Sequence, residues 1–555
     1  MADEVSTSNL SEVLTQLARD IPDKEAVVHQ CGWDRSGAAV YRTITFRELE
    51  EETNRYCHGL TEAGIRKDMK AILMVRPSIE FFALTFALVR IGAVLVLIDP
   101  GMGRKKLVSS LGSIGAEAFV GIPLAHVLRT MYPSEFRKVK VKITVGRRWF
   151  WGGKKIEQVR SRDASSFPPV RRAPNDKVGI FFTSGSTGPP KGVVYEHSMF
   201  DAQINFLRSH FGYGPGEKDL ATFPLFALFD SCMGMTSVIP DMDATKPGSA
   251  DPSKLVKAIK DQNCTQLYGS PALLENLARY CSENGIVLDS IKRIVTAGAP
   301  IRPDLLVRLH AVLPPGARIH TPYGATEALP VTDISSDVIL KDSLAKTERG
   351  AGTCVGKPLP GNRVRIMAIT DGPVERWERA KVLATGEIGE ICVSGPSVTK
   401  EYYELPEHTR NSKILDTDGT VWHRMGDTGY LDENGDLWFC GRKAHMVVTE
   451  KGAMYPIRCE AIFNKHPRVH RSALVGAGPK GRKRPVIVIE LKRGDDNKDL
   501  DGLKEELLEI GAGNELTKDI KDIIFFGPFP MDVRHNAKIN REKLSEIARR
   551  ELGGT

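Results

Sequence analysis

A loop rich in glycine, serine and threonine follows a short apolar strand, and it constrains the fold more than any other feature. Residues 183–192 read TSGSTGPPKG, and the preceding residues 179–182 read GIFF. Small residues let backbone amides approach phosphate oxygens closely, and the hydroxyl groups add further donors. The GxxxxGK[ST] pattern of a Walker A loop is absent from this segment. We therefore expect a phosphate-binding loop of another type, at the end of a buried strand.

Helix-like and strand-like segments alternate through most of the chain. Helical spacing of apolar residues runs over 46–64 and 271–280. The alternation predicts an α/β fold with largely parallel sheets covered by helices. Residues 364–393 change to short strands with glycine turns, which predicts a β-rich subdomain. The expected strands of the parallel sheets are residues 71–75, 178–182, 266–268 and 293–296.

The longest apolar stretch, residues 81–98, has about the length of a membrane crossing. Arg90 and Gly92 interrupt it, and Asp99 and Pro100 follow it. We interpret it as a buried helix ending near Arg90 and then a buried strand over 93–98, as in sheets covered by helices. We expect no transmembrane segment. The first residues also lack the basic start and apolar run of a secretory signal.

Composition narrows the possible environment and partners. The chain has 555 residues, so a single compact core is excluded and about three or four units are expected. A net charge of +8 is small for this length and does not indicate nucleic-acid binding. The nine cysteines are scattered without a CxxC pair. This pattern favours a cytoplasmic protein over a disulfide framework or a zinc site.

Residues 146–160 look like an insertion, with three adjacent aromatic residues beside five basic ones. Such a segment suits a surface that docks onto acidic lipid or onto a partner protein. A partly packed loop with solvated charges is the plainer interpretation, and the sequence favours it.

Further motifs follow the loop in a fixed order, and together they resemble the adenylate-forming superfamily. That superfamily includes acyl-CoA synthetases, luciferases and the adenylation domains of peptide synthetases. The similarity covers residues 40–545, and it implies a large N-terminal domain, residues 1–441, and a small mobile α+β C-terminal domain, residues 442–555. The motifs are AGAP at 297–300, YGATE at 323–327, WHRMGD at 422–427, GR at 441–442 and NAKI at 536–539.

The resemblance implies an enzyme that uses ATP and Mg²⁺ to activate a carboxylate as an acyl-adenylate. Tyr323 would stack on adenine, and Asp427 would accept the ribose hydroxyls beside Arg442. Thr326 would donate to the α-phosphate, and Glu327 would hold Mg²⁺. Lys538 would neutralise the charge that develops during transfer. The other implied nucleotide-binding residues are Thr183, Ser184, Gly185, Ser186, Thr187, Gly188, Lys191, Gly298, Ala299, Pro300 and Gly324.

Several positions depart from the superfamily pattern. Ala227 in FPLFALFD stands where many members have histidine, and Ala444 occupies a hinge position that is commonly Asp or Lys. These segments, with SVIPDMD at 237–243 and PMDVRHNAK at 530–538, resemble the β-lactone synthetases of olefin biosynthesis. That resemblance implies a long-chain 2-alkyl-3-hydroxy acid, whose 3-hydroxyl closes a β-lactone and expels AMP after pyrophosphate has left. Other enzymes of the same pathway are the implied partners.

Two other hypotheses remain open. The chain can be a long-chain acyl-CoA or acyl-carrier-protein ligase, or a catalytically silent nucleotide-binding scaffold. The presence of Glu327, Asp427 and Lys538 argues against the scaffold. An acyl tunnel is expected along 223–229 and the helix after 269–271. The base for ring closure is not evident, and three histidines are candidates by position alone: His423, His445 and His535.

Overall fold

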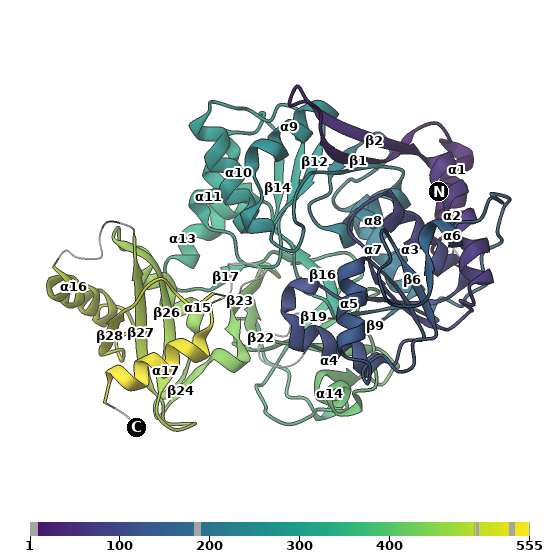
Figure 1. Ribbon diagram of the computed structural model, residues 1–555. Helices are drawn as coiled ribbons and strands as arrows, with labels where there is room; N and C mark the ends of the chain where they lie inside the picture. The colour runs from purple at the N-terminus through teal and green to yellow at the C-terminus, as the bar shows by residue number, and fades with distance from the viewer. Residues whose placement is uncertain (1–8, 183–189, 493, 495–498, 532–538, 554–555) are drawn as a thin grey trace.

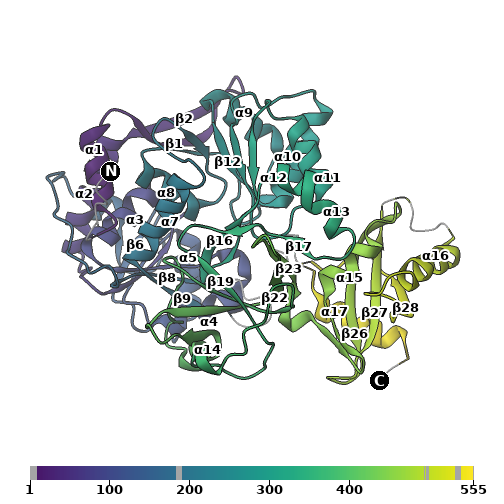
Figure 2. The same cartoon turned by 180° about the vertical axis from the view of Figure 1, so that it is seen from behind.

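The computed structural model describes residues 9–182, 190–492, 494, 499–531 and 539–553. Two helix-covered sheets form the bulk of the molecule, a β-rich region lies beside them, and the last elements form a separate body at one end (Figures 1 and 2). The α/β architecture expected from the sequence is confirmed. Within the described ranges, no helix is both long enough and apolar enough to cross a membrane.

The first large sheet has seven strands in the order β7-β6-β5-β3-β4-β8-β9. Neighbouring strands run parallel except β8 and β9, which pair antiparallel. Its strands are β3 (Lys70–Met74), β4 (Val94–Leu97), β5 (Ala118–Gly121), β6 (Val141–Thr144), β7 (Lys154–Lys155), β8 (Lys177–Phe182) and β9 (Gly192–Glu196). The helices along this part of the chain are α2 (Phe46–Glu62), α3 (Ile79–Ile91), α4 (Arg104–Ile114), α5 (Pro123–Met131), α6 (Ile156–Val159) and α7 (His197–Ser209).

Alternation along the strands decides which helices cover which face. Ile72 and Val96 belong to one hydrophobic cluster with residues of α4 and α5. Their neighbours Leu73 and Leu95 point the other way and pack with α2 and α3. Because successive side chains of a strand face opposite sides, an uninterrupted apolar strand is buried on both faces.

The apolar stretch 81–98 folds as helix α3 followed by strand β4, so the expected division near Arg90 is confirmed. The side chain of Ser78 caps the start of α3, and Gly92 ends it with a φ of 80°. The Arg90 side chain is fully buried and forms an ion pair with Glu50 at 2.6 Å. Pairing is what makes a buried guanidinium tolerable.

The second seven-stranded sheet has the order β14-β13-β12-β10-β11-β1-β2, and only β1 and β2 pair antiparallel. Its strands are β1 (Glu25–Trp33), β2 (Ala39–Thr45), β10 (Lys218–Leu220), β11 (Thr236–Ile239), β12 (Gln266–Tyr268), β13 (Arg293–Val295) and β14 (Arg318–His320). Its helices are α8 (Pro224–Met233), α9 (Pro252–Gln262), α10 (Pro271–Glu283) and α11 (Pro303–Ala311), and α1 (Glu12–Asp20) precedes β1.

The expected β-rich region is present between the large sheets and the C-terminal elements. One sheet has the order β17-β23-β22-β20-β19, with β21 paired to β22, and a smaller one has the order β15-β16-β18. The bounds are β15 (Tyr323–Ala325), β16 (Ala328–Asp333), β17 (Thr353–Cys354), β18 (Lys357–Pro358), β19 (Arg363–Met367), β20 (Gly389–Ser394), β21 (Lys413–Leu415), β22 (Val421–Leu431) and β23 (Leu437–Arg442). Short helices accompany them: α12 (Ser336–Val338), α13 (Leu344–Thr347) and α14 (Pro406–Ser412).

The C-terminal elements form their own sheet, β26-β27-β28, and the hairpin β24-β25. Hydrophobic clusters lie on both faces of this sheet. Among the described strands, no pairing joins it to the sheets that precede residue 442. The bounds are β24 (Val447–Thr449), β25 (Gly452–Met454), α15 (Pro456–Phe463), β26 (Val469–Ala477), β27 (Arg484–Leu491), α16 (Leu500–Ala512), β28 (Asp522–Phe525) and α17 (Arg541–Glu551).

Candidate active site

A cavity of about 3610 Å³ lies where the carboxyl ends of both parallel sheets face the β-rich and C-terminal elements. Residues just after the strands line it, among them Val75, Ile98 and Thr296. This edge of an open α/β sheet is where ligands bind. Of the residues expected from the sequence, those in the described part all line the cavity: Lys191, Gly298, Ala299, Pro300, Tyr323, Gly324, Thr326, Glu327, Asp427 and Arg442. Thr183, Ser184, Gly185, Ser186, Thr187, Gly188 and Lys538 lie outside the described residues.

Tyr323, Asp427 and Arg442 form one hydrogen-bonded group. Asp427 and Arg442 face each other on the antiparallel strands β22 and β23, with Oδ1 and Nη1 3.0 Å apart. The Tyr323 hydroxyl donates to Asp427 Oδ2 at 2.6 Å. Burial and the nearby Asp427 raise the pKa of Tyr323 well above its ordinary value, so the phenol stays protonated. The group presents a carboxylate held between a cation and a hydroxyl donor.

The turn between β15 and β16 carries Thr326 and Glu327, and two tyrosines fix it. Tyr402 donates to Glu327 Oε1 at 2.6 Å, and Tyr195 donates to the Thr326 carbonyl at 2.6 Å. The Lys191 ammonium lies 5.1 Å from the centre of the Tyr402 ring. Lys191 and Glu327 therefore meet around one aromatic side chain, although 136 positions separate them in the chain.

The AGAP segment follows β13 and forms a second wall of the polar part of the cavity. Thr296 N donates to the His320 carbonyl at 2.9 Å, which holds the start of the segment against β14. Gly298 has a φ of 91°, a conformation that favours glycine. The segment and Tyr323 line the same cavity, so their expected roles at one nucleotide base are geometrically compatible.

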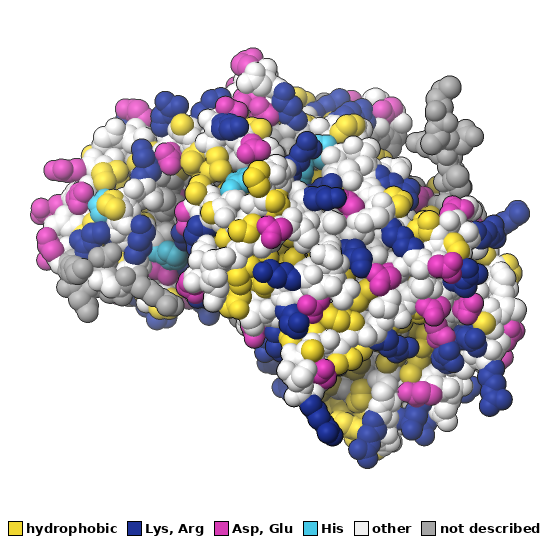
Figure 3. Space-filling model, turned by 90° about the horizontal axis from the view of Figure 1, so that it is seen from above, with side chains coloured by type: hydrophobic (Ala, Val, Ile, Leu, Met, Phe, Trp, Pro, Cys, Tyr) yellow, Lys and Arg dark blue, Asp and Glu magenta, His cyan; other side chains and the backbone are white. Residues whose placement is uncertain are grey.

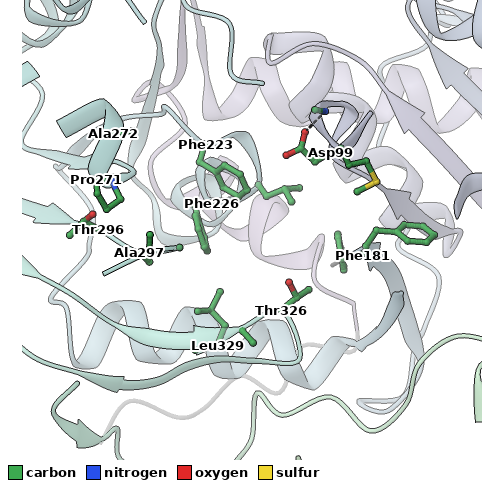
Figure 4. Close-up of a pocket in the computed structure, with 18 of the residues that line it drawn as sticks. Asp99, Phe181, Phe223, Phe226, Pro271, Ala272, Thr296, Ala297, Thr326 and Leu329 are labelled. Atoms are coloured by element: carbon green, nitrogen blue, oxygen red, sulfur yellow. Dashed lines mark hydrogen bonds between the residues drawn. The ribbon is translucent and has the colours of Figure 1, made fainter. Parts of the chain in front are cut away.

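The cavity continues into an apolar region. Phe223, just before α8, and Phe226 of α8 surround the space above Thr326 and Leu329, together with Pro271 and Ala272 at the start of α10 (Figure 4). The rings of Phe226 and Tyr268 are 4.5 Å apart. Both segments expected to form an acyl tunnel thus contribute to the wall.

Ala227, where the resemblance led us to expect histidine in many members, does not belong to the described lining of this cavity. It is buried, and its carbonyl accepts a hydrogen bond from Ser237 Oγ at 3.0 Å. The side chains on either side of it, Phe226 and Leu228, line the cavity instead. Position 227 therefore cannot supply a polar group to a ligand here.

Two of the three candidate histidines, His423 and His445, line the cavity, and among the described residues His423 has an unpartnered ring nitrogen. His423 is buried, and the unpartnered nitrogen is Nδ1. Burial and the nearby Lys413 hold the pKa of His423 well below its ordinary value. His445 also lines the cavity, and burial lowers its pKa to about 4. His535 lies outside the described residues.

Tyr402 and Lys413 were not expected from the sequence. Lys413 is buried, donates to the Thr399 carbonyl, and has its pKa lowered to about 7 by burial. Thr399 in turn donates its amide N–H to the Glu327 carbonyl at 2.9 Å. No motif marks these residues, because they reach the Glu327 turn from a distant part of the chain: Lys413 lies in β21, and Tyr402 lies between β20 and α14.

One further cluster in the described part of the chain has the composition of a metal site: His210, His320 and Asp333. Both imidazoles contact Asp333 Oδ2, His210 at 2.9 Å and His320 at 2.7 Å. None of the three lines the cavity. The cluster ties α7, β14 and β16 together beside the Tyr323 strand.

The fold, with its cavity at the carboxyl ends of two parallel sheets, is that of the AMP-binding enzymes. A family model described as AMP-binding enzyme matches residues 14–403, and the chain belongs to that family. It is 45% identical over 543 residues to the olefin beta-lactone synthetase of Xanthomonas campestris, covering 97% of each chain. The olefin beta-lactone synthetase of Stenotrophomonas maltophilia is also 45% identical, over 98% of each chain. The resemblance to this group is therefore confirmed.

Solved structures with low sequence identity share the fold. The amide bond synthetase McbA from Marinactinospora thermotolerans has a TM-score of 0.76 at 22% identity, with 97% of this chain and 99% of that one covered. ATP-bound MatB from Rhodopseudomonas palustris has a TM-score of 0.76 at 20% identity, with 98% and 99% covered. A complex of Bacillus subtilis MenE with ATP and magnesium ion has a TM-score of 0.72 at 21% identity, with 96% and 98% covered.

Proposed function

We propose that the protein uses ATP to convert a long-chain 2-alkyl-3-hydroxy acid into a β-lactone, releasing AMP and pyrophosphate. One observation carries the proposal: a single cavity joins the polar group of Tyr323, Asp427 and Arg442 to the apolar wall that includes Phe223 and Phe226. The two relatives at 45% identity are named olefin beta-lactone synthetase, which supports the same activity for this chain.

In this proposal the nucleotide occupies the polar part of the cavity. Asp427 accepts the ribose hydroxyls, Arg442 pairs with that carboxylate, and Tyr323 stacks on adenine. Thr326 donates to the α-phosphate, while the loop 183–188 and Lys191 bind the outer phosphates. The Gly298–Pro300 segment and Gly324 pack against the base.

Glu327 fits a magnesium ligand, because its carboxylate lines the cavity and Tyr402 bonds one oxygen. Bound Mg²⁺ would supply charge neutralisation on the phosphates. The complex of MenE with ATP and magnesium ion supports this assignment by analogy of fold alone.

The first chemical step is proposed to form the acyl-adenylate. A carboxylate oxygen of the substrate bonds to the α-phosphorus, the bond to the bridging oxygen breaks, and pyrophosphate leaves. Lys538 offsets the negative charge between the two reacting groups. We propose that it is carried there by a mobile C-terminal domain, residues 442–555, and the separate sheet and clusters of that region support the division.

The second step closes the ring. The 3-hydroxyl oxygen bonds to the acyl carbon, the bond from that carbon to AMP breaks, and the hydroxyl proton passes to a base. We propose His423 for this role, since it lines the cavity and its Nδ1 has no hydrogen-bond partner among the described residues. The attack is intramolecular, so orientation within the cavity offsets part of the cost of ring strain.

The test is product analysis with ATP, Mg²⁺ and a synthetic 2-alkyl-3-hydroxy acid, without coenzyme A. We expect stoichiometric AMP and a β-lactone, identified by its carbonyl infrared band and by mass. AMP release only after coenzyme A is added, with accumulation of a thioester, would establish a long-chain acyl-CoA ligase instead. Association with other enzymes of the olefin pathway and a cytoplasmic location stay predictions.

A further inference from the structure

A strongly basic segment of the chain spans helices α4 and α5. Residues 104–155 contain twelve Lys and Arg but only two Glu, a net charge of +10, whereas the whole chain carries +8. The rest of the molecule is therefore slightly negative. The segment contains α4, α5 and the aromatic loop after β6, and Lys105, Lys140, Arg147, Lys154 and Lys155 are exposed.

Large hydrophobic side chains are exposed in the same segment. Leu124 and Met131 on α5 are 70% and 55% exposed, and Trp149 and Phe150 after β6 are 54% and 75% exposed. Surface apolar side chains gathered in this way mark a site of interaction.

The aromatic loop is anchored so that its tip stays outward. Trp151 is buried, stacks on His126 of α5 with ring centres 5.4 Å apart, and donates to Thr144 Oγ1 at 2.9 Å. Among the described residues, the only ring that Trp149 and Phe150 contact outside their own pair is that of Trp151. The loop is thus partly packed, as expected from the sequence, because one aromatic residue packs and two do not.

The large cavity reaches this surface. Its lining includes Leu124, Val127, Leu128 and Met131 of α5, together with Arg104 at the start of α4. Leu124 and Met131 are therefore both exposed and part of the cavity wall. The face seen from above also carries exposed hydrophobic side chains among charged ones, many of them Lys and Arg (Figure 3).

We propose that the surface formed by α4, α5 and residues 146–155 docks onto an anionic lipid bilayer. Its Lys and Arg side chains pair with anionic headgroups, and Trp149, Phe150, Leu124 and Met131 insert at the level of the acyl chains. A fatty acid substrate passes from the bilayer into the cavity beside α5 without crossing water. This last point rests on the proposed function, whereas lipid binding itself does not.

Lipid explains the surface better than a polyanion in water does. Basic residues alone would suit nucleic acid or an acidic protein. Neither partner accounts for four exposed apolar side chains, two of which, Leu124 and Met131, also line the cavity. Aromatic side chains beside Lys and Arg are typical of membrane interfaces.

The test is flotation of the full-length protein with vesicles of phosphatidylcholine, with and without phosphatidylglycerol. We expect binding to vesicles with anionic lipid that is about tenfold or more stronger than to neutral ones, and weaker in high salt. Trp149→Ser with Phe150→Ser should remove most of it, and so should Arg147→Glu with Lys154→Glu. Arg549→Glu with Arg550→Glu, at two exposed positions of α17, changes the net charge equally and should leave binding intact.

A readout on the unmodified protein guards against misfolded variants. Brominated phosphatidylcholine in the vesicles should quench tryptophan fluorescence, and Trp149→Phe should lose most of that quenching. No flotation of the unmodified protein with anionic vesicles, or equal loss in both charge-reversal pairs, overturns the proposal. Neither assay requires turnover, so the result is independent of whether a β-lactone is formed.

Discussion

The Tyr323 hydroxyl donates a hydrogen bond of 2.6 Å to Asp427, and Arg442 contacts the other oxygen of the same carboxylate at 3.0 Å. All three side chains line the cavity. The carboxylate is thus already oriented and charge-compensated before any ribose reaches it. A ribose hydroxyl that binds Asp427 would replace the Tyr323 hydroxyl as donor, so the carboxylate needs little reorganisation.

Asp427→Ala should therefore weaken the use of ATP more than the loss of the phenol does. Hydrogen bonds to charged groups contribute about 1.5–3 kcal/mol, so kcat/KM for ATP should fall about 10- to 100-fold. Tyr323→Phe keeps the ring for stacking and should cost less than tenfold. Pyrophosphate exchange at varied ATP measures both. Glu433→Ala, an exposed carboxylate near the same strands, is the control. Equal activity of Asp427→Ala and this control would exclude the ribose role.

Lys538→Ala should abolish adenylation while leaving nucleotide binding nearly unchanged. Removing one group aimed at developing charge costs roughly 10²–10³ in rate. Acid-dependent pyrophosphate exchange gives the rate, and equilibrium binding of ATP gives the affinity. Lys504→Ala on α16 is the matched control, because that lysine is exposed. Full exchange in Lys538→Ala would remove the assignment of this lysine.

His423→Gln should separate the two chemical steps. If His423 takes the hydroxyl proton, lactone formation should slow roughly 10²-fold or more, while pyrophosphate exchange continues. The acyl-adenylate should then accumulate, and quenched samples analysed by mass spectrometry would reveal it. His445→Gln, another histidine of the cavity wall, should leave both steps close to the unmodified rates. Parallel loss of exchange and lactone formation would instead indicate a structural role for His423.

Phe226 should set how long a chain the apolar region accepts. Phe226→Trp fills space beside Tyr268. Burying one CH₂ group contributes about 0.8 kcal/mol, so kcat/KM for long substrates should fall about fourfold for each methylene that no longer fits. Short 3-hydroxy acids serve as the internal control, because they do not reach the altered wall. Pyrophosphate exchange across a chain-length series gives the profile. An unchanged profile would place the chains elsewhere in the cavity.

The fold was predictable where local pattern and burial agree. The division of residues 81–98 into α3 and β4 followed from Arg90 and Gly92, since a charge and a glycine interrupt an otherwise uniform apolar run. Residues that line the cavity were predictable where motifs mark them, as for Tyr323 and Asp427. The residues that support this site from distant parts of the chain could not be predicted, because the contact of Tyr402 with Glu327 forms only when the chain folds.

Two carboxyl groups that are distant in the sequence, Asp219 on β10 and Asp230 on α8, are buried together in the folded protein. This pair leads to a prediction about stability. Asp219 and Asp230 are both almost fully buried, and Ser237 Oγ donates to Asp230 Oδ2 at 2.8 Å. Burial raises the pKa of Asp219 to about 7, and burial together with Asp219 raises that of Asp230 well above its ordinary value. The pair therefore holds protons in the folded protein that the unfolded chain has released by neutral pH.

Because these folded-state pKa values are raised, the contribution of the pair to stability is greatest below the ordinary carboxyl pKa near 3.9 and falls as pH rises through about 7. The free energy of unfolding should accordingly decline between pH 6 and pH 8. Asp230→Asn keeps an acceptor for Ser237 and removes the like charge, so it should flatten that decline. Urea unfolding at pH 6, 7 and 8 measures it, with exposed Asp418→Asn as control. An equally steep decline in Asp230→Asn would show that other groups cause it.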